Sequence, residues 1–182
     1  MPKIERMWVK RDGIALCAIP KNGSTSFINA LRSSKFLTQE ELLLCDKRVA
    51  FFRDPVTRWS SAYSFFHYLN ENDYNGQIKK IPKSVTHNGY EAWVDFALEV
   101  ALSEEPNMHW CRQTDITGGF ETHAYRFDWE NIQKHWGKHW PGKLPGWENA
   151  LTSHLPTTDY RAGEIADYYA ADYAKFKSIA VI

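Results

Sequence analysis

The sequence predicts an α/β fold with a central, mostly parallel sheet. Two short apolar runs, residues 14–19 and 49–52, are each followed by a turn and then by apolar residues at helical spacing. A third run, residues 124–127, precedes another helical pattern. Strands that alternate with helices favour a parallel sheet covered by helices on both faces. We therefore expect a single-domain three-layer fold over residues 1–182, because this length corresponds to about one domain.

The first strand leads into a polar loop and a helix. Residues 14–19 form an apolar run between Gly13 and Pro20, as is typical of a buried strand. Residues 21–26 (Lys-Asn-Gly-Ser-Thr-Ser) then supply a glycine and several hydroxyls, and residues 27–31 return to helical spacing. This segment predicts a strand, a loop and the start of a helix.

The second strand, residues 49–52, repeats this pattern. Pro55 suits the first turn of a helix, and Trp59, Tyr63 and Phe66 lie on one apolar stripe of that helix. The chain thus contains two successive units in which a buried strand feeds a helix.

The remaining chain predicts three more helices, over residues 90–102, 129–136 and 162–179, where apolar residues again recur at helical spacing. Residues 75–89 contain Gly and Pro amid Lys and Asn, and they predict a surface loop. Residues 137–160 are also rich in Gly and Pro. Loops of this length often carry function.

The charge of the chain argues against a nucleic-acid partner. Lys plus Arg and Asp plus Glu each number 22, so no strong whole-protein field attracts a polyanion. The charge is unevenly distributed, however, because residues 1–66 have more basic than acidic side chains and residues 67–182 have the reverse. We therefore expect an anionic ligand to bind against the first third of the chain.

The cysteines predict a reducing compartment. Cys17, Cys45 and Cys111 are odd in number and far apart, which favours neither a disulfide framework nor a thiolate zinc site. No His, Asp or Glu cluster has metal-ligand spacing, so we expect no metal cofactor. No apolar run approaches the roughly 18 residues of a membrane span. These observations predict a cytoplasmic protein.

The loop after the first strand has the chemistry of an anion site. Backbone N–H groups at a helix start have no intrahelical partner and lie at the positive end of the dipole, so they bind phosphate or sulfate. Gly23 allows close approach of the backbone, and Lys21 adds a mobile cation. An ordinary capped helix is the alternative. The loop differs from the nucleoside triphosphate P-loop because Lys21 precedes Gly23.

A second polar segment follows the second strand. It runs from Arg53 to Tyr63 and has the pattern Arg-x-Pro-x-x-Arg-x-x-Ser-x-Tyr. Arg53 at a strand end can present its planar guanidinium to a phosphate, and Ser61 lies on the helix face nearest that end. For Arg58, a surface ion pair is the alternative to a role in anion binding.

Together these two segments resemble the cofactor-binding signatures of sulfotransferases that use 3′-phosphoadenosine 5′-phosphosulfate (PAPS). Both occur in the order of that family, each after a predicted strand. The resemblance implies that Arg53 and Ser61 hold the 3′-phosphate. It implies that the 5′-phosphosulfate is bound by the first loop, through Lys21, Asn22, Gly23, Ser24, Thr25 and Ser26.

Further stretches are similar to the carbohydrate branch of this family. Residues 107–110 with Gln113 resemble its His-Trp segment, and residues 125–131 resemble its Tyr-Asp-x-x-x-x-Glu segment with an Arg at the Asp position. Residues 169–176 are similar to its closing helix, whereas its Asn-Ser element has only residues 152–157 as a counterpart. The resemblance implies a hydroxyl acceptor on a saccharide.

Sulfuryl transfer requires stabilisation of the leaving phosphate and a base for the acceptor hydroxyl. Lys21 is the candidate for the first role. His109 is the first candidate for the base, since an imidazole suits the task and a sugar ring could stack on Trp110 beside it. A structural role is the alternative for His109, and His67 is the next candidate.

Glu40 and Glu41 are further candidates for the base, because they lie between the two signatures. The sequence as a whole predicts a PAPS-dependent sulfotransferase whose acceptor site is open or completed by a second chain. The first alternative is a non-catalytic nucleotide- or glycan-binding module on the same fold. The second is a nucleotide-dependent kinase, which the order of Lys21 and Gly23 argues against.

Overall fold

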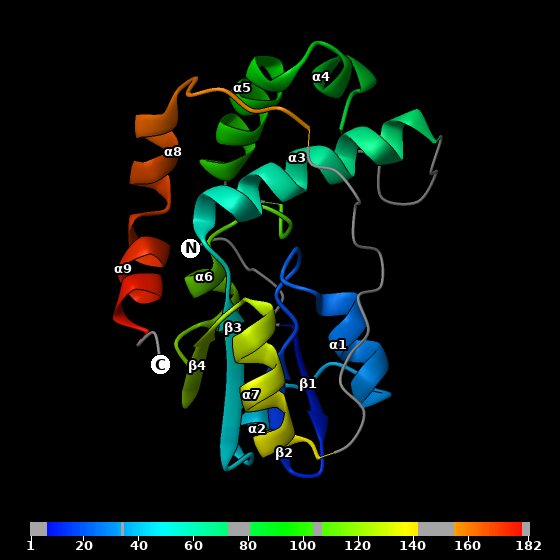
Figure 1. Cartoon of the computed structure of the whole chain (residues 1–182), viewed down its shortest axis with the longest axis vertical. Coiled ribbons are helices and arrows are strands. Elements are labelled where there is room, and N and C mark those ends of the chain that lie inside the picture. Colours follow the sequence, from blue (N-terminus) through cyan, green and yellow to red (C-terminus); the bar gives the residue numbers. More distant parts are fainter. Residues whose placement is uncertain (1–6, 34, 73–80, 104–106, 142–154, 180–182) are drawn as a thin grey trace.

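The computed structural model of the chain describes residues 7–33, 35–72, 81–103, 107–141 and 155–179 (Figure 1). The strands are β1 (Trp8–Arg11), β2 (Ile14–Cys17), β3 (Lys47–Phe52) and β4 (His123–Arg126). The helices of the described residues are α1 (Ser24–Leu31), α2 (Gln39–Leu43), α3 (Pro55–Glu71), α4 (Lys83–His87), α5 (Tyr90–Ala101), α6 (Gln113–Thr117), α7 (Trp129–His139), α8 (Ala162–Tyr168) and α9 (Ala170–Ser178).

The four described strands form one open sheet in the order β1-β2-β3-β4. β2 pairs with β3 and β3 with β4 in parallel, whereas β1 pairs with β2 as an antiparallel hairpin strand. Leu16 lies opposite Val49, and Ala50 lies opposite Ala124. The predicted α/β class and the mostly parallel sheet are therefore confirmed.

Apolar side chains cover both faces of the sheet. On one face, Leu16 and Phe51 pack with Phe27 of α1 and Trp136 of α7. On the other face, the alternate residues Cys17, Ala50 and Phe52 pack with side chains of α6 and the end of α9. Because successive strand residues point to opposite faces, burial of both faces explains why these strands are continuously apolar.

A third apolar cluster lies beyond the sheet, where Figure 1 places α3, α4 and α5 together. It contains Trp59 and Phe66 of α3, Trp93 of α5, Trp110 and Tyr169. The ring centroids of Trp93 and Trp110 are 5.0 Å apart in an edge-to-face arrangement. Much of the high aromatic content is thus used for packing.

Some element boundaries differ from the sequence prediction. Residues 83–87 form α4 inside the predicted surface loop, while residues 73–80 and 142–154 lie outside the described part. The terminal helix is interrupted at Tyr169, so that α8 and α9 are separate helices. In the described ranges, no helix combines the length and the apolar character that a membrane crossing requires.

Candidate anion-binding site

The two polar segments meet at one edge of the sheet. The loop after β2 and Arg53 after β3 both follow the carboxyl ends of strands that pair in parallel. A guanidinium nitrogen of Arg53, Nη1, donates a hydrogen bond to the carbonyl oxygen of Lys21 at 2.8 Å. In open α/β sheets, this edge is where ligands bind.

The loop before α1 has an unusual backbone. Lys21 and Gly23 both have positive φ, 67° and 70°. A Cβ atom at position 23 would lie 3.1 Å from the Phe127 ring, which explains the need for glycine there. Gly23 is the N-cap of α1 and provides no side-chain cap. The first turn of α1 therefore retains N–H groups suited to an anion.

Three cationic side chains converge beside this loop: Lys21, Arg53 and Arg58, which we call the cationic cluster. Burial, then Arg53 and Arg58, lower the pKa of Lys21 to about 8. Burial and then Arg58 lower the pKa of Arg53. Within the described residues, none of the three forms an ion pair with a carboxylate. Asp54 lies close enough to act on the charge of Arg53 without pairing with it, so the cluster keeps positive charge that a bound anion would offset.

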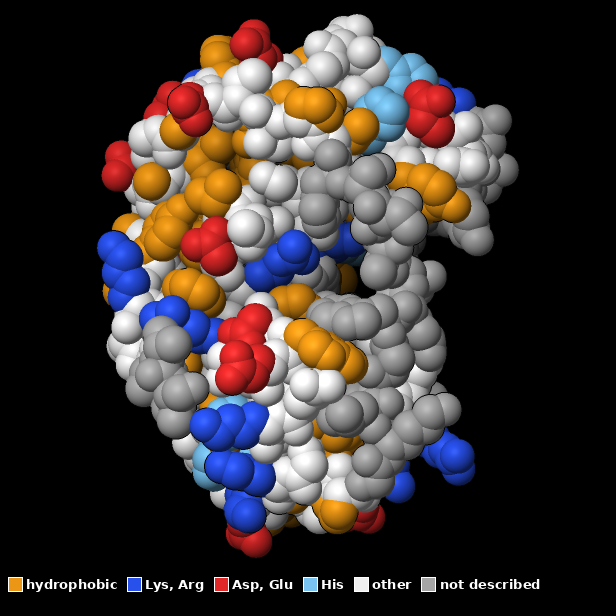
Figure 2. Space-filling view, viewed as in Figure 1, with side chains coloured by type: hydrophobic (Ala, Val, Ile, Leu, Met, Phe, Trp, Pro, Cys, Tyr) orange, Lys and Arg blue, Asp and Glu red, His pale blue; other side chains and the backbone are white. Residues whose placement is uncertain are grey.

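Basic side chains gather at one place on the surface of the molecule (Figure 2). Figure 2 shows Lys and Arg side chains gathered at a hollow in the middle of the face, between α3 and the elements of the sheet. The Lys21 ammonium lies 3.9 Å from the centroid of the Phe65 ring, which forms a cation–π contact with it. The ammonium thus rests on an aromatic surface of α3 and has no carboxylate partner among the described residues.

We expect the affinity for an anionic nucleotide to fall as the pH rises above about 8, where Lys21 loses its proton. Well below this pH the ammonium is fully present, so the affinity contribution of Lys21 is constant there. The expected decrease between pH 8 and 9.5 is about tenfold in calorimetric titrations with 3′-phosphoadenosine 5′-phosphate. Lys21→Arg is the matched control, because a guanidinium stays charged and should remove this pH dependence. An equally steep decrease in both chains would show that Lys21 is not the titrating group.

His109 lies next to the cationic cluster. Its ring stacks on Phe65 with centroids 5.5 Å apart, and its Nδ1 lies 2.9 Å from the side-chain oxygen of Asn107. Because an amide oxygen only accepts, Nδ1 carries the proton and Nε2 holds the free lone pair. Burial, then the charges of Lys21 and Arg58, lower the pKa of His109 to about 4. The ring is therefore neutral at pH 7.

The predicted stacking of a sugar on Trp110 is wrong. Trp110 is fully buried in the aromatic cluster beyond the sheet, and its indole N–H donates to the carbonyl of Ala97 at 3.1 Å. A ring packed on all sides offers no face to a ligand. Both rings pack on Phe66, but Trp110 is fully buried whereas His109 is half-buried next to the cationic cluster.

The other base candidates lie in different surroundings. His67 is half-buried on α3, with its ring 6.2 Å from that of Tyr63. Glu41 closes a capping box with Thr38 at the start of α2 and pairs with Lys35. Glu40 is exposed on the same helix. Glu41 already serves as a helix cap. His109 differs from the other candidates because its ring stacks on Phe65, the ring over which the Lys21 ammonium lies.

Asn22 is turned into the protein. Its side-chain N–H group donates to the carbonyl of Phe51 at 2.8 Å and to Gln113 at 2.6 Å, and the residue is almost fully buried. Gln113 also accepts from the backbone N–H of Arg53 at 2.9 Å. Asn22 and Gln113 thus join the two polar segments through hydrogen bonds inside the protein. The predicted contact of the Asn22 side chain with a cofactor is not part of this arrangement.

The hydroxyl side chains take different positions in their helices. Ser24, Thr25 and Ser26 occupy the first turn of α1, with Thr25 exposed and Ser26 buried. Ser61 is buried on α3, two turns from Arg53.

The surface ion pair considered for Arg58 is wrong. Its side chain is completely buried and donates to three backbone carbonyls, of Pro20, Met108 and Cys111. This guanidinium is a fixed internal cation of the site, and no described carboxylate is its partner.

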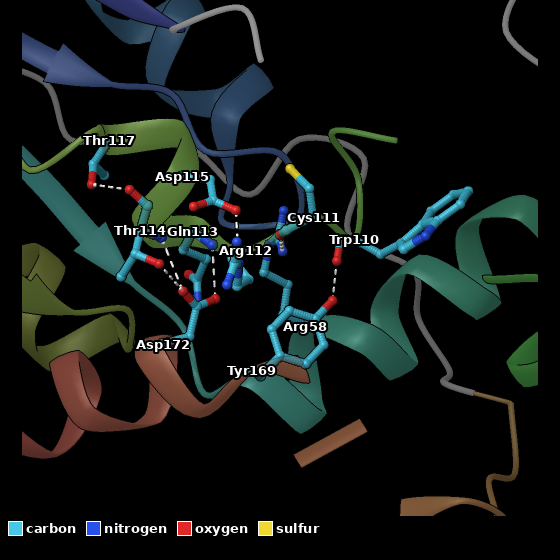
Figure 3. Close-up of polar contacts among 10 residues, drawn as sticks. All are labelled: Arg58, Trp110, Cys111, Arg112, Gln113, Thr114, Asp115, Thr117, Tyr169 and Asp172. Atoms are coloured by element: carbon cyan, nitrogen blue, oxygen red, sulfur yellow. Dashed lines mark hydrogen bonds and ion pairs between the residues drawn. The ribbon is translucent and has the colours of Figure 1, made fainter. Parts of the chain in front are cut away.

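Asp172 of α9 anchors α6 beneath the site. Its carboxylate accepts from the backbone N–H groups of Gln113 at 2.7 Å and Thr114 at 2.9 Å, and from the Thr114 hydroxyl (Figure 3). The hydroxyl of Tyr169 donates to the carbonyl of Trp110. The predicted closing helix therefore caps α6 through Asp172. The sequence does not reveal this role, because Asp172 is far from Gln113 and Thr114 in the chain.

We expect Asp172→Asn to lower the free energy of unfolding by about 1–3 kcal/mol, because an amide cannot accept all four hydrogen bonds of the buried carboxylate. Asp128→Asn is the matched control. Asp128 caps α7 through the N–H of Asn131 but is exposed, so its loss should cost less than about 1 kcal/mol. Urea denaturation at pH 7 measures the free energy of unfolding of both variants. Equal losses would contradict the role given to Asp172.

The structure also gathers three histidines that the sequence leaves scattered. His123, His135 and His139 surround Tyr125, whose hydroxyl lies 2.9 Å from Nε2 of His139 and whose ring stacks on His135. Burial, then neighbouring basic groups, lower the pKa of His139 to about 4. Only the fold brings these residues of β4 and α7 together.

A metal centre is not evident in the part of the chain that the structure describes, where no three His, Cys, Asp or Glu side chains are grouped for ligation. The three cysteines are free and buried. The counterpart of the Asn-Ser element, residues 152–157, lies partly outside the described ranges. No family model, curated protein or solved structure matches this chain.

Proposed function

We propose that this chain is a sulfotransferase that moves a sulfuryl group from PAPS to a hydroxyl of a saccharide. The observation that supports the proposal is the cationic cluster: Lys21 and Arg53, from two separate signatures, touch at the carboxyl ends of β2 and β3. A bisphosphorylated nucleotide would supply the negative charge that the described residues do not. We also propose that residues 1–182 form a single domain with three layers, as the sequence predicts.

In this proposal, Lys21 and the start of α1 hold the 5′-phosphosulfate. Sulfuryl transfer builds negative charge on the leaving phosphate oxygens, and a cation beside them lowers the barrier. Lys21 is suited to this because its ammonium forms no ion pair with a carboxylate of the described residues. Arg53 and Ser61 bind the 3′-phosphate, so that the two phosphates fix the nucleotide at both ends.

His109 takes the proton of the acceptor hydroxyl in the same proposal. Its Nε2 holds the lone pair, because Nδ1 is bonded to Asn107. Burial, then the charges of Lys21 and Arg58, lower its pKa to about 4. An anion bound at the cluster would offset the charges of Lys21 and Arg58 and so reverse the smaller part of this decrease. Cofactor binding would therefore strengthen the base.

The low pKa of His109, about 4, also supports a second candidate. A ring that resists protonation is a weak base, so the chain could bind PAPS or a glycan without catalysis. This non-catalytic binding module requires the same cationic cluster. A nucleotide-binding measurement tests the cationic cluster, which both candidates require. A sulfuryl-transfer assay distinguishes the enzyme from the binding module.

The experiment is an assay with PAPS labelled in its sulfuryl group, offered neutral and uronic acid-containing oligosaccharides. The proposal predicts label in the saccharide and release of 3′-phosphoadenosine 5′-phosphate. Loss of transfer in His109→Ala with unchanged nucleotide affinity would support the base. Tight nucleotide binding without transfer to any acceptor would favour the binding module instead.

A further inference from the structure

We infer that Arg58 is a positioning residue that holds Lys21 and His109 in one fixed arrangement. The inference rests on the proposed function of those two side chains. Figure 3 shows the guanidinium of Arg58 reaching from α3 to the segment of Cys111. Arg58 contacts the backbone of both loops that carry the candidate reacting groups, although it reaches neither group itself.

The first contact is made to the loop of Lys21. Nε of Arg58 donates to the carbonyl of Pro20 at 3.0 Å, and Nη1 of Arg53 donates to the next carbonyl, that of Lys21, at 2.8 Å. Arg53, just before α3, and Arg58, near the start of α3, therefore hold two successive carbonyls. Lys21 has a φ of 67°, which a residue with a side chain rarely adopts without such support.

The second contact is made to the segment of His109. Nη2 of Arg58 donates to the carbonyl of Met108 at 2.9 Å, and Nη1 donates to that of Cys111 at 2.5 Å. Met108 directly precedes His109, just as Pro20 directly precedes Lys21. One planar guanidinium thus links the residues before both candidate reacting groups.

The chemistry of the contacts favours positioning over simple stabilisation. A buried guanidinium satisfied by carbonyls keeps its full positive charge, which is costly compared with an apolar residue of the same volume. A lysine in its place would keep the charge but could not reach three carbonyls in one plane. The function of the planar fork is therefore to fix the geometry of the two loops.

The test compares Arg58→Lys with Arg48→Lys. Arg48 is the matched control because it also clamps backbone carbonyls, those of Phe120 and Cys45 at 2.6 and 2.8 Å, from within β3. We expect Arg58→Lys to lower kcat for sulfuryl transfer by about tenfold to a hundredfold. The Kd for 3′-phosphoadenosine 5′-phosphate should change by less than about threefold. Arg48→Lys should leave kcat unchanged, whatever decrease in melting temperature it causes.

A second measurement does not depend on transfer. NMR of lysines labelled at Cε reports the pKa of Lys21, which is about 8 because burial lowers it from 10.5. A loop released by Arg58→Lys would expose the ammonium, so this pKa should rise by about one pH unit or more. Arg48→Lys should leave it unchanged. If wild-type protein showed no transfer, the proposed function would fail while this measurement still tested Arg58.

Three results would overturn the inference. The first is an unchanged pKa of Lys21 in folded Arg58→Lys protein. The second is a decrease in kcat that is matched by Arg48→Lys at equal loss of melting temperature. The third is loss of the whole fold in Arg58→Lys while Arg48→Lys folds, which would show that Arg58 supports the protein as a whole.

Discussion

Replacement of Lys21 by alanine should lower the kcat of sulfuryl transfer by about a hundredfold to a thousandfold, the effect of removing one group that stabilises developing charge. Binding of 3′-phosphoadenosine 5′-phosphate should persist with lower affinity, because Arg53 and the start of α1 remain. The physical reason is that the Lys21 ammonium lies near Arg53 and Arg58, over the Phe65 ring, with no described carboxylate partner. Steady-state kinetics and calorimetry on the same preparation measure the two effects.

Lys175→Ala is the matched control for this prediction. Lys175 also lies over an aromatic ring, 5.6 Å from the centroid of Phe52, but it is paired with Glu121 at 2.7 Å. Its removal should leave kcat unchanged. If Lys21→Ala retained full kcat, the leaving-group role of Lys21 would be wrong, and the loop would serve binding alone.

Replacement of Arg53 by alanine should weaken the binding of 3′-phosphoadenosine 5′-phosphate by about 2–3 kcal/mol, through loss of charge-assisted contacts. The affinity for AMP, which has no 3′-phosphate, should decrease much less. The difference between the two ligands separates the 3′-phosphate contact from any loosening of the Lys21 loop, whose carbonyl Arg53 also holds. Calorimetry with both nucleotides makes this comparison.

Arg161→Ala provides the control for Arg53. Its guanidinium is paired with Asp95 at 2.8 Å and Glu164 at 2.6 Å, so these two carboxylates offset its charge. We expect no change in affinity for either nucleotide. Equal weakening of AMP and of the bisphosphate by Arg53→Ala would mean that the second signature does not recognise the 3′-phosphate.

The fold was predictable where local pattern and burial agree. β2 and β3 are apolar runs because both faces of the sheet are covered, and Pro55 begins α3 as its position predicts. β1 was not predicted, because Trp8–Arg11 becomes a strand only by pairing with β2. The short helix α6 was not predicted either, since its cap, Asp172, comes from a distant part of the chain.

The candidate site was predictable only in part. Lys21 and Arg53 follow strands, and the rule that parallel strand ends share an edge brings them together. The inward turn of Asn22 and the burial of Arg58 depend on Gln113 and on the segment of Cys111, which no local pattern connects to them. The sequence identifies the charges of the site, but tertiary packing decides which of them face a ligand.

The most direct test of the cofactor site is calorimetry with 3′-phosphoadenosine 5′-phosphate, AMP and ATP in the absence of added metal. We predict that the bisphosphate binds at least about tenfold more tightly than AMP or ATP. This preference would assign the cationic cluster to a 3′-phosphorylated adenine nucleotide. Equal affinity for all three nucleotides, or binding of none, would contradict the assignment of Lys21 and Arg53 to a PAPS site.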